Sequence, residues 1–266
     1  MRWASLPMYD LPAVRPATDA WWAGLARHLR AAGVAGVPDG LARDPAPAWT
    51  EPGLLLGQTC GYPLTHALAG RVELLCTPAY AAPGCDGACY ASLLVVPRDA
   101  DAAALADCRG GVCAVNAPDS HSGYNVLRRM VAPLAGARRF FARVVETGSH
   151  AASLAAVAAG RADLCAVDAV THALLDRHEP GRLAGTRVLM RSPRAPGLPC
   201  VTGPATTADE RARMRDAVRA ALADPGLEDA RAELLITGAA ELPLTAYDEI
   251  LALEREAVAM GYPVLR

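Results

Sequence analysis

The feature that most constrains the fold of this chain is an alternation of short apolar runs with longer stretches of helical period. The runs at 54–58, 93–96 and 164–168 are apolar at nearly every position, as is typical of strands buried on both faces of a parallel sheet. The intervening stretches place apolar residues on one helical face. This order predicts an α/β protein whose mostly parallel sheets are flanked by helices.

Hydroxyl residues, glycines and prolines mark the expected ends of these elements. Thr18 is predicted to begin the first helix and Gly33 to end it, and Ser149 is predicted to cap a helix over 151–159. After the proline-rich turn at 192–204 we expect only helices, over 207–223, 228–236 and 245–260. The predicted strands cover 3–7, 54–58, 72–77, 93–96, 112–116, 141–146, 164–168 and 188–191.

A length of 266 residues accommodates two lobes of ordinary size. The chain runs through two successive sets of strands and helices and then returns with helices alone. We therefore expect a discontinuous first lobe over 1–92 plus 193–266, which includes the C-terminal helices, and a second lobe over 93–192. The crossings are expected near 91–97 and 187–198.

The charged residues exclude several classes of function. The formal net charge is -2, so the chain has no overall basic field to attract nucleic acid or an anionic membrane. All 26 basic residues are arginine, which excludes chemistry that needs a lysine Schiff base or a P-loop lysine. No window approaches the roughly 20 apolar residues of a membrane helix. We expect no nucleic-acid partner, no membrane insertion and, in the sequence as given, no signal peptide.

The eight cysteines are too sparse for a disulfide scaffold, and their spacings fit no common zinc motif. Cys85 and Cys89 lie in a glycine-rich loop, where they suit a disulfide with each other or with Cys60, or unpaired thiols. We predict no metal site and no cofactor.

The most informative polar segment follows the predicted strand at 112–116. It contains Ser120, His121, Ser122 and Gly123 directly before a helix. Small hydroxyl residues and glycine at such a position direct backbone N–H groups, hydroxyls and the positive end of the helix dipole to one point. This pattern favours an oxyanion site, and simple helix capping by one of the serines is the alternative.

A second segment repeats the arrangement, because the predicted strand at 141–146 is followed by Thr147, Gly148, Ser149 and His150. Two helix starts would then lie at the carboxyl ends of neighbouring strands, where open α/β sheets bind ligands. Either His150 donates to the anion from its ring or it faces solvent.

Two further places carry polar groups at strand ends. Asp168 either holds an ammonium or hydroxyl group of the ligand or caps the following helix. Gln58, Thr59, Cys60 and Tyr62 either line a cleft or form a proline-stabilised turn.

Two further sets of reactive or charged residues are weaker candidates for a functional role. A nucleophile and base pair of Cys60 with His150 or His66 lacks an acidic partner to orient it. Arg128 and Arg129 are predicted to lie on a solvated helix face.

Four segments together resemble a known family. They are 54–59, 87–92, the motif Asn116-x3-Ser120-x-Ser122-Gly123-Tyr124, and the stretch 147–163 that begins Thr-Gly-Ser-His. The chain is similar, through most of its length, to the phosphate/phosphite/phosphonate-binding (PhnD-like) proteins of ABC transporters, which have a type 2 periplasmic-binding-protein fold.

The resemblance implies two α/β lobes with a ligand cleft between them and no catalytic residue. It implies that Ser120, Ser122, the Gly123 backbone and His150 surround a phosphoryl-like group. It also implies that Tyr90 and Tyr9 line the cleft and that Asp168 faces the non-anionic end of the ligand. His121 departs from the family, which usually has a small or hydroxylated residue there. The predicted ligand-binding residues are Tyr9, Gln58, Thr59, Tyr90, Asn116, Ser120, His121, Ser122, Gly123, Tyr124, His150 and Asp168.

The resulting hypothesis is a non-catalytic, monomeric solute-binding protein that captures a small phosphorus oxyanion and presents it to an ABC permease. The family resemblance implies a periplasmic location, while the absence of a visible leader leaves a cytoplasmic one open. Two alternatives remain. One is an enzyme on the same scaffold that uses Cys60 or His150 on a small phosphorylated or heterocyclic substrate, and the other is a cytosolic ligand sensor.

Overall fold

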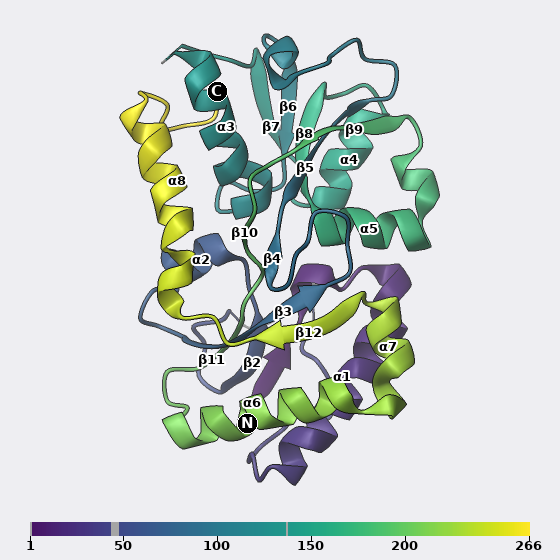
Figure 1. Cartoon of the computed structure of the whole chain (residues 1–266), viewed down its shortest axis with the longest axis vertical. Helices are drawn as coiled ribbons and strands as arrows, with labels where there is room; N and C mark the ends of the chain where they lie inside the picture. The colour runs from purple at the N-terminus through teal and green to yellow at the C-terminus, as the bar shows by residue number, and fades with distance from the viewer. Residues whose placement is uncertain (1, 44–47, 137) are drawn as a thin grey trace. The chain divides into compact units, whose positions relative to one another are not determined.

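The computed structural model, shown in Figure 1, describes residues 2–43, 48–136 and 138–266. The chain divides into two compact units. Unit 1 comprises Met1–Ala81, Asp86–Ala88 and Pro196–Leu244, and unit 2 comprises Ala82–Cys85, Cys89–Ala195 and Thr245–Arg266. Each unit contains a five-stranded sheet with helices, which confirms the predicted α/β class.

The sheet of unit 1 combines strands from both ends of the chain. In spatial order its strands are β1 (Trp3–Ser5), β2 (Leu54–Gln58), β11 (Cys200–Thr202), β3 (Glu73–Tyr80) and β12 (Ile236–Ala240). β1 pairs with β2 in parallel, β11 runs antiparallel to both β2 and β3, and β12 runs antiparallel to β3. The expectation that only helices follow the proline-rich turn at 192–204 is therefore wrong, because β12 follows it, and the turn itself contains β11. β11 has three residues and β12 consists largely of small residues, so pairing with β3 rather than an apolar pattern makes them strands.

The helices of unit 1 are α1 (Arg15–Ala31), α2 (Gly61–Thr65), α6 (Ala208–Ala223) and α7 (Glu228–Glu233). α1 buries Trp22, Leu25 and Leu29 and contacts both α6 and α7. The predicted helix start at Thr18 is wrong, because α1 already begins at Arg15. The Thr18 hydroxyl instead donates to the Val14 carbonyl at 3.2 Å.

The sheet of unit 2 is mixed. In spatial order its strands are β7 (Arg143–Glu146), β6 (Val112–Val115), β8 (Leu164–Asp168), β5 (Ser92–Pro97) and β9 (Thr186–Arg191). β6 is parallel to β7 and β8, whereas β5 is antiparallel to β8 and β9. We expected mostly parallel sheets, but a fully apolar run shows only that a strand is buried and does not reveal its direction.

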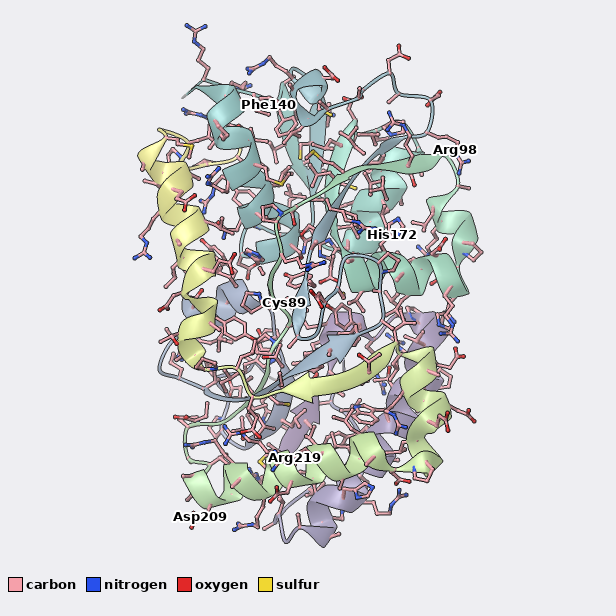
Figure 2. All side chains as sticks on the ribbon, in the orientation of Figure 1. Cys89, Arg98, Phe140, His172, Asp209 and Arg219 are labelled. Carbon is pink, nitrogen blue, oxygen red and sulfur yellow. The ribbon has the colours of Figure 1, made fainter. Side chains whose placement is uncertain are left out.

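Helices complete unit 2. A π-helical turn (His121–Asn125) leads into α3 (Val126–Ala135), and the others are α4 (His150–Ala158), α5 (Ala169–His178) and α8 (Asp248–Ala259). Phe140, labelled in Figure 2, meets Phe141 edge to face at 4.9 Å in the core. Ser149 accepts a hydrogen bond from the Ala152 backbone N–H, which confirms the predicted cap of α4.

Short segments connect these elements. Apart from Asp86–Ala88, the chain leaves unit 1 after Ala81 and returns at Pro196. β4 (Cys89–Tyr90) pairs with β10 (Ala195–Pro196) in a separate two-stranded sheet. Single 3-10 turns lie at Pro7–Tyr9, Pro12–Val14, Leu105–Cys108, Pro180–Leu183, Pro225–Leu227 and Leu244–Tyr247.

The last helix, α8, packs in unit 2, although the expected boundary placed it in the first lobe. The Asn125 side-chain amide donates to the Ile250 carbonyl at 3.1 Å, and Arg128 lies 3.0 Å from Glu254. The backbone N–H of Phe140 donates to the Arg266 carbonyl at 2.7 Å. These contacts use polar groups of α3 and the loop after it, which hydrophobic periodicity does not reveal.

Because α8 belongs to the core of unit 2, truncating its buried residue should destabilise the protein. Ile250 is fully buried and Val258, on the same helix, is 49% exposed. We expect Ile250→Ala to lower the free energy of unfolding by about 2–5 kcal/mol. Val258→Ala should cost less than about 0.5 kcal/mol. Urea denaturation of both variants measures the difference, and equal losses would show that α8 is not a core element.

Candidate ligand-binding site

A cluster of polar residues gathers at the carboxyl ends of the parallel strands β6 and β8 in unit 2. β6 leads through Asn116 into the π-helical turn, and β8 ends at Asp168 directly before α5. α4 follows β7, the other neighbour of β6. Helix N-termini at this edge present backbone N–H groups that have no partner within the helix, together with the positive ends of the helix dipoles.

Ser120 is the residue that begins the π-helical turn. Its hydroxyl oxygen accepts a hydrogen bond from the Gly123 backbone N–H at 3.1 Å, so the capping interpretation is confirmed for this serine. The same oxygen lies 3.5 Å from the Ser122 hydroxyl. Both serines are buried, which keeps the two hydroxyls side by side and away from bulk water.

Ser122 and His150 connect the two predicted helix starts. The Ser122 hydroxyl oxygen and the His150 Nε2 atom are hydrogen-bonded at 2.9 Å. Burial lowers the pKa of His150 to about 4. The imidazole is therefore neutral at pH 7, and the expectation that the two helix starts lie together is confirmed for this pair.

Gly123 is required by a close approach and not by its backbone angles. A Cβ atom at this position would lie 1.8 Å from Asn116 Oδ1 and 3.1 Å from His150 Cε1. Asn116 Oδ1 is itself buried and accepts no hydrogen bond from any residue that the structure describes. The amide of Asn116 thus has hydrogen-bonding capacity left for a ligand.

His121, the departure from the family pattern, is 2% exposed. Its Nδ1 lies 3.3 Å from the side-chain nitrogen of Asn125, and its ring meets Tyr90 edge-on at 6.3 Å. Burial lowers the pKa of His121 to about 4. Because the Asn125 amide nitrogen can only donate, the neutral ring accepts at Nδ1 and carries its proton on Nε2.

Two predicted ligand residues have structural partners within unit 2. The Tyr124 hydroxyl oxygen accepts from the Leu265 backbone N–H at 3.0 Å. Asp168 Oδ1 accepts from the backbone N–H groups of Val170 at 2.7 Å and Thr171 at 3.1 Å, which confirms its capping role at α5. The contact of either residue with a ligand stays a prediction.

Asp168 also influences a neighbouring thiol. Burial, followed by the negative charge of Asp168, raises the pKa of Cys85 to about 11. None of the eight cysteines, all of which lie in the described part of the chain, is in a disulfide bond. The disulfide considered for Cys85, Cys89 and Cys60 is therefore absent from the structure.

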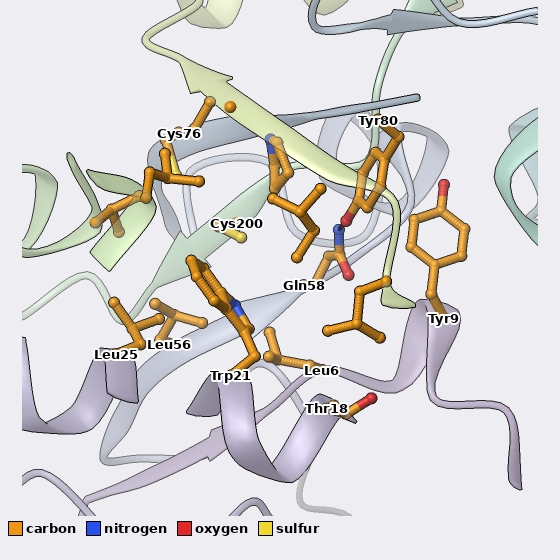
Figure 3. A pocket seen from close by; sticks show the side chains of 17 residues that line it. Leu6, Tyr9, Thr18, Trp21, Leu25, Leu56, Gln58, Cys76, Tyr80 and Cys200 are labelled. Carbon is orange, nitrogen blue, oxygen red and sulfur yellow. Dashed lines mark hydrogen bonds between the residues drawn. The ribbon is translucent and has the colours of Figure 1, made fainter. Parts of the chain in front are cut away.

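The remaining predicted residues belong to unit 1. The Gln58 side-chain amide donates to the Tyr80 hydroxyl at 3.0 Å, and the Tyr80 ring meets Tyr9 edge-on at 5.0 Å. Figure 3 shows these three side chains at one end of an apolar pocket. Thr59 is fully buried, and its backbone N–H donates to the Pro199 carbonyl. Gln58 and the two tyrosines thus form a polar edge on an apolar interior.

The Cys60–His66 alternative gains no support from the geometry of His66. Its ring stacks on Tyr62 at 3.9 Å, and its Nδ1 is hydrogen-bonded to the Tyr62 carbonyl and the Thr65 hydroxyl. These local contacts fix the ring to the α2 segment.

Sequence reasoning missed two residues that support the cluster. Arg128 was expected on a solvated face, yet it is 4% exposed and donates to Asn125 Oδ1 at 2.7 Å and to the Pro263 carbonyl at 2.8 Å. Asn125 in turn contacts His121. The spacing of four residues between His121 and Asn125, which places them on one helical face, is the signal that could have found this pair.

The described residues, 2–43, 48–136 and 138–266, contain no group of three or more His, Cys, Asp or Glu side chains arranged to hold a metal ion. None of their helices has both the length and the hydrophobicity that a membrane crossing requires.

Solved structures of binding proteins have the same fold. A binding protein component of an ABC phosphonate transporter from Pseudomonas aeruginosa aligns with a TM-score of 0.76 and 20% identity over 97% of this chain and 88% of its own. PhnD1 from Prochlorococcus marinus, in complex with methylphosphonate, aligns with a TM-score of 0.74 and 12% identity over 96% and 97%. XAC2383 from Xanthomonas citri, bound to ATP, aligns with a TM-score of 0.70 and 18% identity over 97% of both chains.

The sequence itself matches a family model over residues 55–246, which is most of the chain. No curated protein sequence matches significantly. The family is described as the periplasmic substrate-binding protein of phosphonate ABC transporters, and its members bind solutes and work with a permease rather than act as enzymes. The matched region includes the polar cluster at the ends of β6 and β8. The chain belongs to this family of phosphonate ABC transporter substrate-binding proteins.

Proposed function

We propose that this protein binds a phosphorus oxyanion, a phosphonate or phosphate, at the Ser122 cluster, which we define as Asn116, Ser120, Ser122, Gly123 and His150. The observation that carries the proposal is the 2.9 Å hydrogen bond between Ser122 and His150, which joins the starts of two helices at neighbouring strand ends. Two helix dipoles and a set of hydroxyl, imidazole and amide groups are thereby directed to one place.

The cluster contains no formal positive charge, since its histidine is neutral at pH 7. An oxyanion is stabilised here by short hydrogen bonds from O–H and N–H groups, which strengthen when water is excluded. The buried Asn116 Oδ1 adds an acceptor among the donors. An acceptor at this place suits an oxyanion that still carries one proton, because a fully deprotonated group has no hydrogen to give it.

The other predicted residues complete the proposal. Tyr9, Gln58, Thr59, Tyr90, His121, Tyr124 and Asp168 contact the remainder of the ligand, with Asp168 toward its non-anionic end. The protein acts as a monomer in the periplasm and delivers its ligand to an ABC permease. The family to which the chain belongs supports this location and partner.

Removing either member of the central hydrogen bond should weaken binding. Isothermal titration with phosphate, phosphite, methylphosphonate, 2-aminoethylphosphonate and sulfate identifies the ligand. We expect Ser122→Ala and His150→Ala to raise its Kd by about 10- to 100-fold, the effect of losing a hydrogen bond to a charged group.

The matched control is Ser153→Ala, which removes a buried hydroxyl on α4 that is bonded to the Thr147 hydroxyl. It should leave Kd within about threefold. An unchanged Kd in both Ser122→Ala and His150→Ala would place the anion elsewhere. No measurable binding of any phosphorus oxyanion to the unmodified protein would refute the proposed ligand class.

Gly123→Ala should disrupt the cluster by a steric clash. Its new methyl group would overlap Asn116 Oδ1, so the Asn116 side chain or the turn must move. We expect at least a tenfold loss of affinity and a loss of about 1–3 kcal/mol of stability. Gly181→Ala, where no atom lies within 4 Å of the added carbon, is the control and should change neither quantity. Equal affinities of the two variants would contradict the geometry of the turn.

The buried histidines should make stability depend on pH. The pKa of His121 is near 6.5 in the unfolded chain and about 4 in the folded protein, so the unfolded state binds more protons between these values. The free energy of unfolding should therefore decrease as the pH falls from about 6.5 to 4, by about 3 kcal/mol for His121 alone. Urea denaturation across this range measures the slope. His121→Asn should reduce the slope and leave the part due to His150, whose pKa is also lowered to about 4. An unchanged slope in the variant would show that His121 does not titrate in this range.

A further inference from the structure

Outside the Ser122 cluster, the sheet of unit 1 brings two cysteines together. Cys200 on β11 lies directly opposite Cys76 on the antiparallel strand β3, and Gln58 on β2 is its partner on the other side. The thiols of Cys76 and Cys200 are hydrogen-bonded to each other. Both side chains are buried, with 4% and 7% exposure.

The strand register allows these two sulfurs to be bonded without moving the backbone. Directly opposite residues of an antiparallel pair have Cα atoms about 4.5–5.5 Å apart. Disulfides span Cα separations of about 4.4–6.8 Å. The two side chains also share one face of the sheet, because both line the same apolar pocket. Rotation about the side-chain bonds is therefore sufficient.

The pocket provides room for that rotation. It has a volume of about 60 Å³ and lies between the sheet and helices α1 and α6, with Leu25, Leu56 and Val218 in its wall. Figure 3 shows Cys76 and Cys200 among the lining side chains, with Gln58 and Tyr80 nearby. Both cysteines therefore line an apolar space that other side chains leave open.

We propose that Cys76 and Cys200 form a disulfide bond when the chain folds in an oxidising compartment. A small-molecule disulfide such as oxidised glutathione supplies the oxidant. The thiolate of one cysteine attacks it, forms a mixed disulfide and releases one glutathione thiol. The second cysteine thiolate then attacks the protein sulfur of the mixed disulfide and releases the other. The protein loses two thiol protons and two electrons, and the glutathione disulfide is reduced to two thiols.

The bond forms during folding, before the sheet closes over the pair. In the folded protein the hydrogen bond with Cys76, together with burial, raises the pKa of Cys200 well above the usual value of a thiol. Since the thiolate is the nucleophile, the native reduced pair reacts slowly. The same burial protects the disulfide from reductants once it has formed.

The position of the pair in the chain gives the bond a structural consequence. β3 precedes the excursion of the chain into unit 2 and β11 follows the return, so the closed loop contains residues 82–195. Closing so long a loop restricts the unfolded chain strongly. The link would hold together the two segments of unit 1 that the excursion separates.

Cys113 and Cys165 in unit 2 are a matched contrast. They are buried on the neighbouring strands β6 and β8, but Cys113 is paired with Leu164 and Cys165 with Ala114. Because successive residues of a strand point to opposite faces, these two thiols lie on opposite sides of their sheet. They should not form a bond under the same conditions.

The test is to refold the whole chain from denaturant in a glutathione redox buffer and to map its disulfides by mass spectrometry of unreduced peptides. We expect one crosslink, between Cys76 and Cys200, and a Tm about 5–10 °C above that of the protein refolded under full reduction. Native reduced protein exposed to the same buffer should oxidise at least tenfold more slowly than refolding chain.

Two variants extend the test. In Cys76→Ala the difference in Tm between oxidised and reduced protein should vanish, whereas Cys113→Ala should keep it. The peptide map of the unmodified protein decides the question even if a variant fails to fold. Eight titratable thiols after oxidative refolding, or a crosslink only between other cysteines such as Cys85 and Cys89, would overturn the proposal.

Discussion

The hydrogen bond between Ser122 and His150 is the interaction on which the account of the ligand site depends. It joins the turn after β6 to the first residue of α4; the Ser122 hydroxyl is buried, and the imidazole is uncharged at pH 7 because its pKa is lowered to about 4. A protonated His150 would need a compensating negative charge beside it. When the imidazole is neutral, the ligand carries the formal charge of the site. The helix dipoles and the polar hydrogens then stabilise that charge.

The elements around this bond keep it in place. Gly123 lets the turn approach Asn116, and Ser120 closes the turn from its own backbone. The Asn125 side-chain amide donates to the Ile250 carbonyl on α8, and the Arg128 guanidinium donates to Asn125 Oδ1. Through these contacts, α8 is part of the support of the cluster.

Apolar runs and capping residues predicted the elements that depend on interactions between residues close in the sequence. β2 and β8 agree with prediction to the residue, because each is a buried apolar run, and Ser149 caps α4 as its position indicated. β11 and β12 depend on pairing with β3, so periodicity could not find them. The helix α8 was predicted, but its place in unit 2 depends on polar contacts with α3 and the turn before it, which periodicity does not reveal. Thr18 shows the limit of capping rules, since a hydroxyl one turn into a helix bonds backwards to the preceding carbonyl.

In the candidate site, too, the sequence predicted some residues and missed others. The strand-to-helix transitions identified Ser120, Ser122 and His150, and the resemblance to the family assigned them to a phosphoryl group. The buried Asn125 and Arg128 were not identified, because a polar residue on a helix is usually solvated and only the tertiary structure buries it. The family match agrees with the resemblance and makes the chain a substrate-binding protein.

The most direct test of the account is a crystal structure of the protein with a bound phosphorus oxyanion, beginning with methylphosphonate. We expect oxyanion oxygens within hydrogen-bond distance of the Ser122 hydroxyl and the His150 ring, and one oxygen facing the Asn116 amide. An anion bound elsewhere, with the Ser122–His150 hydrogen bond intact and no ligand atom beside it, would contradict the account.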